Sequence, residues 1–329
     1  MIYTVTLNTA LDRILHIKGK IERKKNNRVC GIQYDIGGKG THVSLVLSAL
    51  KIPNIATGFV GKNKKDQFIQ LLERKGVNCD FVVQNNATVR ETLVLLDSTG
   101  EGSLMITEPG FQPTIESIQR LHQKLSQQVQ PGDWVVFAGS PPEGFSPDDY
   151  RELLQCVKEN GGRLVVDTSG PYLETAIQLR PYLIKPNEYE FQQMVGRTLS
   201  TVEEYTGEIE QLMAEGIKYV IVSLGERGSL VGHNGEVFQV IAPSIEARND
   251  TGCGDVFVGG IVAMLSRKAD LEEALCFATA LSASKATHTS SSSFSLEQTR
   301  QLEKQVRIMR RESVCCTLKS VKTCAKSQG

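Results

Sequence analysis

The stretch NDTGCGDVFVGG, residues 249–260, places small residues and a single acid directly before an apolar run. We expect Gly252, Cys253 and Gly254 to lead into a helix over residues 255–265, where glycine lets the backbone approach a ligand closely. A helix start offers unpaired N–H groups and a positive dipole end, which suit a phosphate during transfer. Asp255, in the first turn, could then accept a proton from an attacking hydroxyl. Taken alone, the stretch is also explained by Asp255 as an ordinary first-turn acid.

A second glycine-rich element, DIGGKGTHVS at residues 35–44, also opens a helix. It is not a P-loop, because that motif needs Ser or Thr directly after the lysine, and Gly40 follows Lys39 here. Glycines with a lysine among them still suit a phosphorylated or hydroxyl-rich ligand. The alternative is a tight turn with a solvated lysine.

Two further stretches carry candidate ligand groups. In KPNEYE, Asn187 and Glu190 follow an apolar strand at a spacing that could hold a hydrated magnesium ion. The same spacing is typical of a helix cap, with Asn187 as N-cap and Glu190 completing a capping box. The stretch VSLGERGS at residues 222–229 predicts a strand and a glycine turn, an ordinary hairpin unless a nucleotide lies against it.

Strands and helices alternate along most of the chain, which predicts a parallel sheet with helices on both faces. The expected strands are residues 2–7, 55–60, 134–139, 163–169, 182–187 and 218–225, and the expected helices include 42–50, 66–76, 148–161 and 202–216. Ligands of such sheets bind outside the carboxyl ends of the strands. Those ends carry Asp167, Asn187, Ser223 and Gly225.

Two regions break the alternation. Residues 13–36 and 89–106 have strand patterns with no helix between them, and STGEGS at 98–103 is a hairpin-turn signal. We expect them to form a small sheet that stands off the main domain as a lid.

Near the end of the sequence, Ser295 is a candidate N-cap for a helix over residues 295–311. We expect one folded unit over residues 1–312, with 313–329 as a disordered tail.

Composition excludes several classes of protein. Lysine plus arginine and aspartate plus glutamate balance at 37 each among 329 residues, so no net field recruits nucleic acid or a membrane surface. The amino end has no signal-peptide pattern and no apolar run is long enough to span a bilayer, which favours a cytoplasmic protein. The eight cysteines have no metal-ligand spacing and are expected to be reduced.

The motifs in order resemble the ribokinase-like (PfkB) carbohydrate kinases, in particular the branch that phosphorylates sugar phosphates. The resemblance is carried by TLNTALDR, YDIGGKG, VDTSG, KPNEYE, VSLGERG and NDTGCGD. It implies an α/β fold, a three-layer α/β/α sandwich with a mainly parallel sheet and a β-sheet lid. It also implies ATP and Mg²⁺ as cofactors and a homodimer formed through the lid.

The resemblance also implies roles for individual residues. Asp255 would be the catalytic base, the backbone of Gly252, Cys253 and Gly254 the anion hole, and Asn187 and Glu190 the magnesium-associated pair, acting through water. The implied sugar-phosphate positions are Asp12, Arg28, Gly38, Lys39, His42 and Arg90, with the two arginines on the phosphate. The implied nucleotide positions are Asn187, Ser223, Gly225, Gly228 and Ser284.

His42 departs from the family pattern, which usually has asparagine there. Two roles stay open for it, a hydrogen bond to the sugar or a polar residue at a helix start. The expected reaction moves the γ-phosphoryl group of ATP to fructose 1-phosphate, giving fructose 1,6-bisphosphate. Tagatose 6-phosphate is the alternative substrate, and a non-catalytic sugar-phosphate sensor is the alternative of another class.

Overall fold

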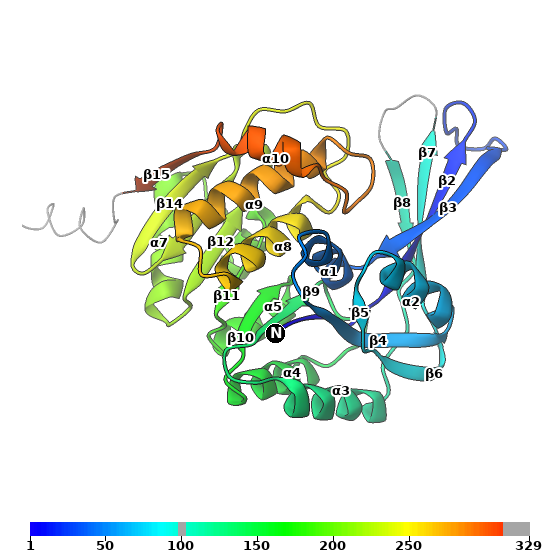
Figure 1. Ribbon diagram of the computed structural model, residues 1–329, viewed down its shortest axis with the longest axis horizontal. Helices are drawn as coiled ribbons and strands as arrows, with labels where there is room; N and C mark the ends of the chain where they lie inside the picture. Colours follow the sequence, from blue (N-terminus) through cyan, green and yellow to red (C-terminus); the bar gives the residue numbers. More distant parts are fainter. Residues whose placement is uncertain (98–102, 312–329) are drawn as a thin grey trace, which may run out of the picture.

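The computed structural model describes residues 1–97 and 103–311, and its centre is one large sheet (Figure 1). The strands of this sheet are β1 (Ile2–Thr6), β4 (Ile55–Asn63), β5 (Asn78–Cys79), β6 (Val82–Thr88), β9 (Trp134–Ala138), β10 (Arg163–Asp167), β11 (Leu183–Ile184), β12 (Tyr219–Ser223), β13 (Ser229–His233), β14 (Glu236–Ile241) and β15 (Arg307–Arg311). Their order is β15-β14-β13-β12-β11-β10-β9-β1-β4-β5, with β6 beside β4. The strands from β12 to β5 pair in parallel, and β13, β14 and β15 add antiparallel pairs at one edge.

Helices cover both faces of this sheet. One face carries α1 (Lys39–Ala49), α8 (Cys253–Ser266) and α9 (Leu271–Ala286), with α10 (Leu296–Glu303) packed on α9; the other carries α3 (Ile115–Gln128), α4 (Pro147–Glu159), α5 (Pro171–Gln178), α6 (Glu188–Val195) and α7 (Val202–Ala214). Neighbouring residues of a strand point to opposite faces. Val136 of β9 therefore packs with Val258 of α8, whereas Phe137 packs with Tyr150 of α4. The predicted three-layer α/β/α sandwich with a mainly parallel sheet is confirmed.

A separate four-stranded sheet forms the predicted lid. It consists of β2 (Ala10–Ile17), β3 (Val29–Gly37), β7 (Arg90–Asp97) and β8 (Ser103–Thr107), in the order β3-β2-β7-β8. Figure 1 shows it standing off the main sheet on the right. Helix α2 (Lys65–Arg74) fills the angle between them, where Phe68 and Leu72 pack with Leu11 of the lid. Most of the predicted turn at 98–103 lies outside the described residues.

The predicted helix over residues 295–311 is correct only in its first half. Ser295 caps α10, where its hydroxyl accepts the Gln298 N–H at 3.2 Å, but the helix ends at Glu303. The chain then forms β15, which pairs antiparallel with β14. Val306 and Ile308, two residues apart, pack against the core, so this segment follows the strand period of two.

Two further expectations concern the ends of the chain and the membrane. The predicted tail at 313–329 lies outside the described residues. Among the helices that are described, none is long and apolar enough to cross a bilayer.

Candidate active site

A cavity of about 1290 Å³ opens at the carboxyl ends of the central strands. Thr6 ends β1, Gly139 follows β9, Lys185 follows β11 and Ser223 ends β12, and all four line it. The strand order reverses here, because β1 pairs with β4 on one side and with β9 on the other. This is the switch point at which ligands of open parallel sheets bind. The cavity exceeds the 300–1,000 Å³ or so of a typical single-ligand pocket, which leaves room for two ligands.

The two ends of the cavity are lined by different elements. We call the end beside the small sheet the lid half and the end beside α9 the α9 half. The lid half is lined by Asn8, Asp12, Arg90, Thr92, Met105 and Thr107. The α9 half is lined by Ser223, Gly225, Gly228, Ala242, Ile245, Ala247, Thr279, Ala283 and Ala286. The amino end of α8, with Asp255, also lines the cavity.

The turn before α8 is shaped by Gly252, which caps the helix at a φ of 85°. A Cβ on Gly252 would stand 2.0 Å from the Ser291 carbonyl oxygen, so no other residue fits. The helix has no side-chain cap, and the Cys253 N–H donates to the Asp250 carbonyl at 3.1 Å. Within residues 1–97 and 103–311, the N–H groups of Gly252, Gly254 and Asp255 have no acceptor. Of the predicted anion hole, Gly252 and Gly254 therefore keep free N–H donors, the Cys253 amide is already engaged, and the free N–H of Asp255 follows next in the helix.

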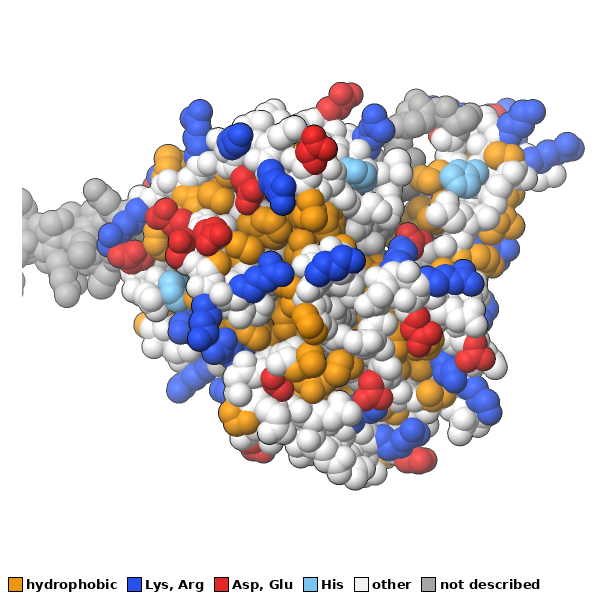
Figure 2. Space-filling view, in the orientation of Figure 1, with side chains coloured by type: hydrophobic (Ala, Val, Ile, Leu, Met, Phe, Trp, Pro, Cys, Tyr) orange, Lys and Arg blue, Asp and Glu red, His pale blue; other side chains and the backbone are white. Residues whose placement is uncertain are grey.

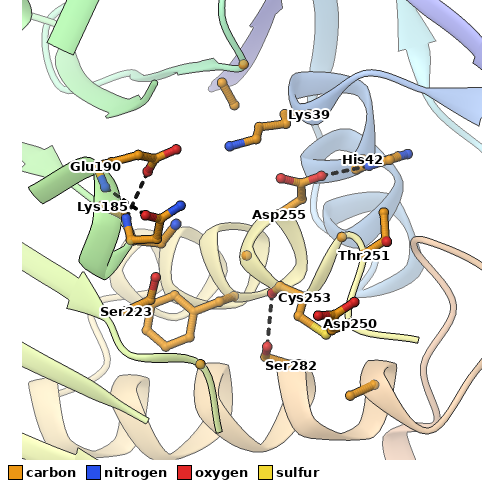
Figure 3. Close-up of a pocket in the computed structure, with 18 of the residues that line it drawn as sticks. Lys39, His42, Lys185, Glu190, Ser223, Asp250, Thr251, Cys253, Asp255 and Ser282 are labelled. Carbon is orange, nitrogen blue, oxygen red and sulfur yellow. Dashed lines mark hydrogen bonds and ion pairs between the residues drawn. The ribbon is translucent and has the colours of Figure 1, made fainter. Parts of the chain in front are cut away.

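Asp255 is nearly buried, and its carboxylate is held by His42. The Nδ1 atom of His42 lies 2.7 Å from Asp255 Oδ2 (Figure 3). Nε2 of the same ring lies 2.9 Å from the Ile36 carbonyl oxygen. Burial alone would lower the pKa of His42, but hydrogen bonding to Asp255 and the charges of Asp255 and Asp12 raise it above its ordinary value. The sequence left a sugar contact and a helix-start role open for His42. Its observed partner is the candidate base.

Three charged side chains lie beside the α8 turn. Asp167, at the end of β10, is 1% exposed, and its carboxylate oxygens lie 3.2 Å from Lys185 Nζ and 3.7 Å from Lys39 Nζ. Burial alone would raise the pKa of Asp167, but Lys185 and Lys39 hold it below its usual range. The Asp167 charge in turn raises the pKa of Lys39 against the effect of burial. Two ammonium groups and one carboxylate leave a net positive charge here.

The direction of these lysines matters for the site. Figure 3 shows Lys39 extending into the space between Glu190 and Asp255. Lys185 Nζ is 3.5 Å from the point where a Cβ on Gly254 would stand, so this cation borders the amino end of α8. Lys39 was expected at the sugar phosphate, and Lys185 was not singled out. The sequence feature that could have identified Lys185 is its position directly after an apolar strand, because a lysine buried there requires a charged partner.

In the lid half, Asp12 and Arg90 are the prominent charges. Asp12 lies opposite Thr92 in the β2–β7 register, and burial raises the pKa of Asp12. Arg90 donates from Nη1 to the Glu108 carbonyl at 3.3 Å and from Nη2 to the Asn8 carbonyl at 3.5 Å. Its Nε is buried and has no partner in the described part of the chain. Nη1 and Nη2 each carry a second hydrogen, so the guanidinium lines the cavity with donor capacity left over.

Arg28 does not join Arg90. It is exposed just before β3 and does not line the cavity, whereas Gly38, also expected at the sugar phosphate, does. The site therefore has one arginine of the expected pair.

The α9 half is built from small side chains and backbone. Gly228 has a φ of 93°, and a Cβ there would stand 1.9 Å from the Val240 carbonyl oxygen. The hydroxyls of Ser229 and Thr279 are buried and without a partner among the residues described. Ser223, Gly225 and Gly228 line this half as expected.

Ser284 points elsewhere. Its hydroxyl accepts the Ser295 N–H at 3.0 Å and donates to Gln298 Oε1 at 2.9 Å, which ties α9 to α10. Its neighbour Ala283 lines the cavity in its place.

Asn187 and Glu190 form a reciprocal capping box at the start of α6. Asn187 Oδ1 accepts the Glu190 N–H, and Glu190 Oε2 accepts the Asn187 N–H, each at 2.8 Å. Both residues also line the cavity. No group of three or more His, Cys, Asp or Glu side chains able to hold a metal occurs in residues 1–97 and 103–311. The two interpretations of this motif are thus compatible, since one Glu190 oxygen takes no part in the cap.

A comparison with known families matches residues 6–299 to the pfkB family carbohydrate kinases. The chain belongs to this family. All of the cavity-lining residues, from Thr6 to Ala286, fall inside the match. A carbohydrate kinase transfers a phosphoryl group to a sugar, and membership implies ATP as the other substrate.

Individual proteins agree with the family. The chain is 33% identical to a 1-phosphofructokinase of Bacillus subtilis (strain 168), over 83% of this chain and 88% of that protein. It is 30% identical to a 1-phosphofructokinase of Vibrio cholerae, over 93% and 96% of the two chains. Among solved structures, phosphofructokinase-2 from Escherichia coli superposes with a TM-score of 0.87 at 24% identity, covering 92% of this chain and 98% of that one. The last likeness shows the ribokinase-like fold.

Proposed function

We propose that this kinase transfers the γ-phosphoryl group of ATP to O6 of fructose 1-phosphate, giving fructose 1,6-bisphosphate and ADP. The observation that carries the proposal is a single cavity in which Asp255 and free helix N–H groups lie with an arginine-bearing half and a half of small side chains. The relatives named 1-phosphofructokinase support the choice of substrate.

Binding of the sugar phosphate falls to the lid half. The second N–H groups of Arg90 Nη1 and Nη2 suit the phosphate that the sugar already carries, because a guanidinium matches phosphate geometry. Asp12 offers a hydrogen-bond partner for sugar hydroxyls at the same wall. Anchoring at these points would orient the free hydroxyl and convert an encounter into a positioned reaction.

The chemical step uses Asp255 as general base. Its Oδ2 is held by His42, so Oδ1 is the oxygen that receives the proton of the sugar hydroxyl. The sugar oxygen forms its bond to the γ-phosphorus while the bond from that phosphorus to the ADP oxygen breaks. No covalent enzyme intermediate is needed, since positioning and charge stabilisation carry phosphoryl transfer.

Charge on the transferring group would be met by Lys39, Lys185 and the N–H groups of Gly254 and Asp255. These donors are fixed before the reaction by Asp167 and by the helix, so they do not need to reorganise. Fixed donors in a site that excludes water are worth more than the same groups in solution.

The residues also fit a Mg²⁺ ion that keeps much of its water shell. Glu190 has a carboxylate oxygen outside the capping box, and Asn187 stands beside it, so they would hold the ion through water. When bound, the ion supplies neutralisation of phosphate charge. The nucleotide itself would lie in the α9 half, against Ser223, Gly225 and Gly228.

A panel of acceptors tests the proposal. ADP release is measured with purified protein on fructose 1-phosphate, fructose 6-phosphate, tagatose 6-phosphate and fructose. We expect the highest kcat/KM for fructose 1-phosphate and a poor reaction with fructose, which lacks the phosphate. A higher kcat/KM for tagatose 6-phosphate would show that this sugar, and not fructose 1-phosphate, is the substrate. Equal kcat/KM with fructose would reject the proposal that Arg90 binds the phosphate of the sugar.

We also propose that two copies of the chain associate through the outer face of the lid. Asp12, Thr92 and Met105 face the cavity, so their strand neighbours face away from it. All four strands place apolar residues on that outer face, beside Arg13, and these are Leu15, Ile32, Leu93, Leu95, Leu104 and Ile106. Ile32, Leu104 and Ile106 are at least half exposed, and Figure 2 shows apolar side chains on the lid. Such a face suits a partner of the same kind.

Light scattering after size-exclusion chromatography checks this dimer. Ile106→Glu should give a monomer, because it places a charge in the apolar face. Met105→Glu is the matched control, since Met105 lies one residue away on the cavity side, and its mass should stay that of the wild type. A wild-type monomer, or equal effects of both variants, would reject the proposed dimer.

A further inference from the structure

We propose that His42 is a positioning residue that holds Asp255 as an imidazolium, with one carboxylate oxygen fixed and the other free for the sugar hydroxyl. The inference rests on the proposed function, because it takes Asp255 as the base. This role differs from the two that the sequence left open for His42, a hydrogen bond to the sugar and a polar residue at a helix start. It deepens the mechanism by naming what sets the orientation of that base.

The first step concerns Nε2. It lies 2.9 Å from the carbonyl oxygen of Ile36, the last residue but one of β3. A carbonyl oxygen only accepts hydrogen bonds, so Nε2 must carry a hydrogen. A neutral histidine has one N–H, and here it is committed to the lid strand.

The second step concerns Nδ1, which faces Asp255 Oδ2 at 2.7 Å. In the neutral ring with hydrogen on Nε2, Nδ1 would present a lone pair to a carboxylate oxygen, which is repulsive. The contact therefore requires a second proton between the two atoms. A charged donor and acceptor at this distance form a charge-assisted hydrogen bond, the stronger class.

The surroundings favour keeping that proton on the ring. His42 is buried between α1, α8 and the lid, which alone disfavours charge. The groups that face it are Asp255 from α8, Asp12 from β2 and the Ile36 carbonyl from β3, and all of them favour the cation. The charge of Arg90 lowers the pKa of Asp12, and the charge of Asp35 raises it. Lys39 lies one turn before His42 on α1.

The consequence is mechanical as well as electrostatic. His42 ties α8 to the lid strand through two hydrogen bonds at opposite ends of one rigid ring. The Asp255 carboxylate cannot rotate without breaking the bond at Oδ2, so Oδ1 keeps its direction. When pH rises enough to remove the extra proton, Nδ1 becomes a lone pair facing Oδ2 and the orientation is lost. The wild-type kcat should fall through that pH.

Nitrogen NMR of histidine-labelled protein, without substrates, tests the charge directly. The chain has five histidines, and the signal absent from His42→Asn identifies His42. We expect its ring to carry hydrogen on both nitrogens at pH 8, well above the ordinary histidine pKa of about 6.5. A ring with a bare Nδ1 at that pH would overturn the proposal. This readout does not depend on any kinase activity, so it stands even if the proposed reaction is wrong.

Two variants then test positioning. Asparagine places an amide near Nδ1, and glutamine places one near Nε2, so His42→Asn keeps an uncharged donor to Asp255 and His42→Gln keeps only the Ile36 contact. We expect kcat to fall less than about tenfold in His42→Asn and about a hundredfold in His42→Gln, since misplacement of about 1 Å has that effect. KM for the sugar phosphate should change little in either.

The pH profiles complete the test. His42→Asn should lack the fall in kcat that the wild type shows at the pH where NMR reports loss of the His42 proton. A wild-type kcat that is constant through that pH would contradict the inference, as would equal kcat values for the two variants. Melting curves of both variants separate these results from unfolding. Turnover of the wild type on fructose 1-phosphate, measured alongside, shows separately whether the proposed function holds.

Discussion

The lid half and the α9 half of the cavity are built on opposite principles. In and beside the lid half, charged side chains are held by protein partners: His42 bonds Asp255, and Arg90 donates to two carbonyl groups. The α9 half has alanines, glycines and hydroxyls that have no partner in the described part of the chain. We infer that the lid half selects its ligand by charge and direction, whereas the α9 half selects by shape.

This contrast predicts how each half responds to substitution. Removing a charge in the lid half should lower turnover or sugar binding and leave the nucleotide untouched. Adding bulk in the α9 half should weaken nucleotide binding and leave the sugar untouched, because packed walls do not absorb extra methylene groups without strain.

The largest effect is expected for Asp255→Asn. The amide cannot take the proton of the sugar hydroxyl, so kcat should fall at least about a hundredfold, the lower range for general bases. Steady-state ADP release measures it, and calorimetric titration with fructose 1-phosphate checks that binding persists. Near-normal turnover would show that another group is the base.

Replacing Arg90 by Ala should lower kcat/KM for fructose 1-phosphate about tenfold to a hundredfold, mostly through KM. The reason is the loss of a charged hydrogen bond to the phosphate already on the sugar. Arg28→Ala is the matched control, because Arg28 does not line the cavity. If Arg28→Ala shows the larger rise in KM, the arginine assigned to the phosphate is the wrong one.

The sequence predicted the location of this site better than the contacts between its side chains. Short apolar strands that end in polar residues located the cavity, because parallel strands bring their carboxyl ends to one edge. The bond between His42 and Asp255 spans 213 residues, and the Lys185–Asp167 pair also depends on the assembled sheet. No local pattern encodes such contacts. The last predicted helix failed for a related reason, since β14 offers an open edge that the sequence of β15 does not reveal.

In the α9 half, Ala283→Leu should raise KM for ATP about tenfold and leave KM for the sugar phosphate nearly unchanged. The added side chain would occupy space next to Ala286 and Ile245 that we assign to the nucleotide. Initial rates at varied ATP and saturating sugar phosphate measure the effect. A shift in sugar KM instead would break the division between the two halves.

The smallest kinetic effect is expected at Ser284, the residue after Ala283. Ser284→Ala removes hydrogen bonds to Ser295 and Gln298 of the α10 region, so it should reduce the free energy of unfolding by about 1–2 kcal/mol. KM for ATP should stay unchanged, because this side chain faces away from the cavity. Urea denaturation and ATP titration are the measurements, and a raised KM with unchanged stability would return Ser284 to the nucleotide site.

The claim that depends on every part of the cavity is that a second phosphate is added to a sugar that already carries one. Phosphorus NMR of the wild-type reaction with ATP and fructose 1-phosphate labelled with carbon-13 at C6 tests it directly. We predict a new phosphorus signal split by the labelled carbon, rising in step with ADP. ATP consumed with only inorganic phosphate as the other product, or a new phosphate ester without that splitting, would contradict the account.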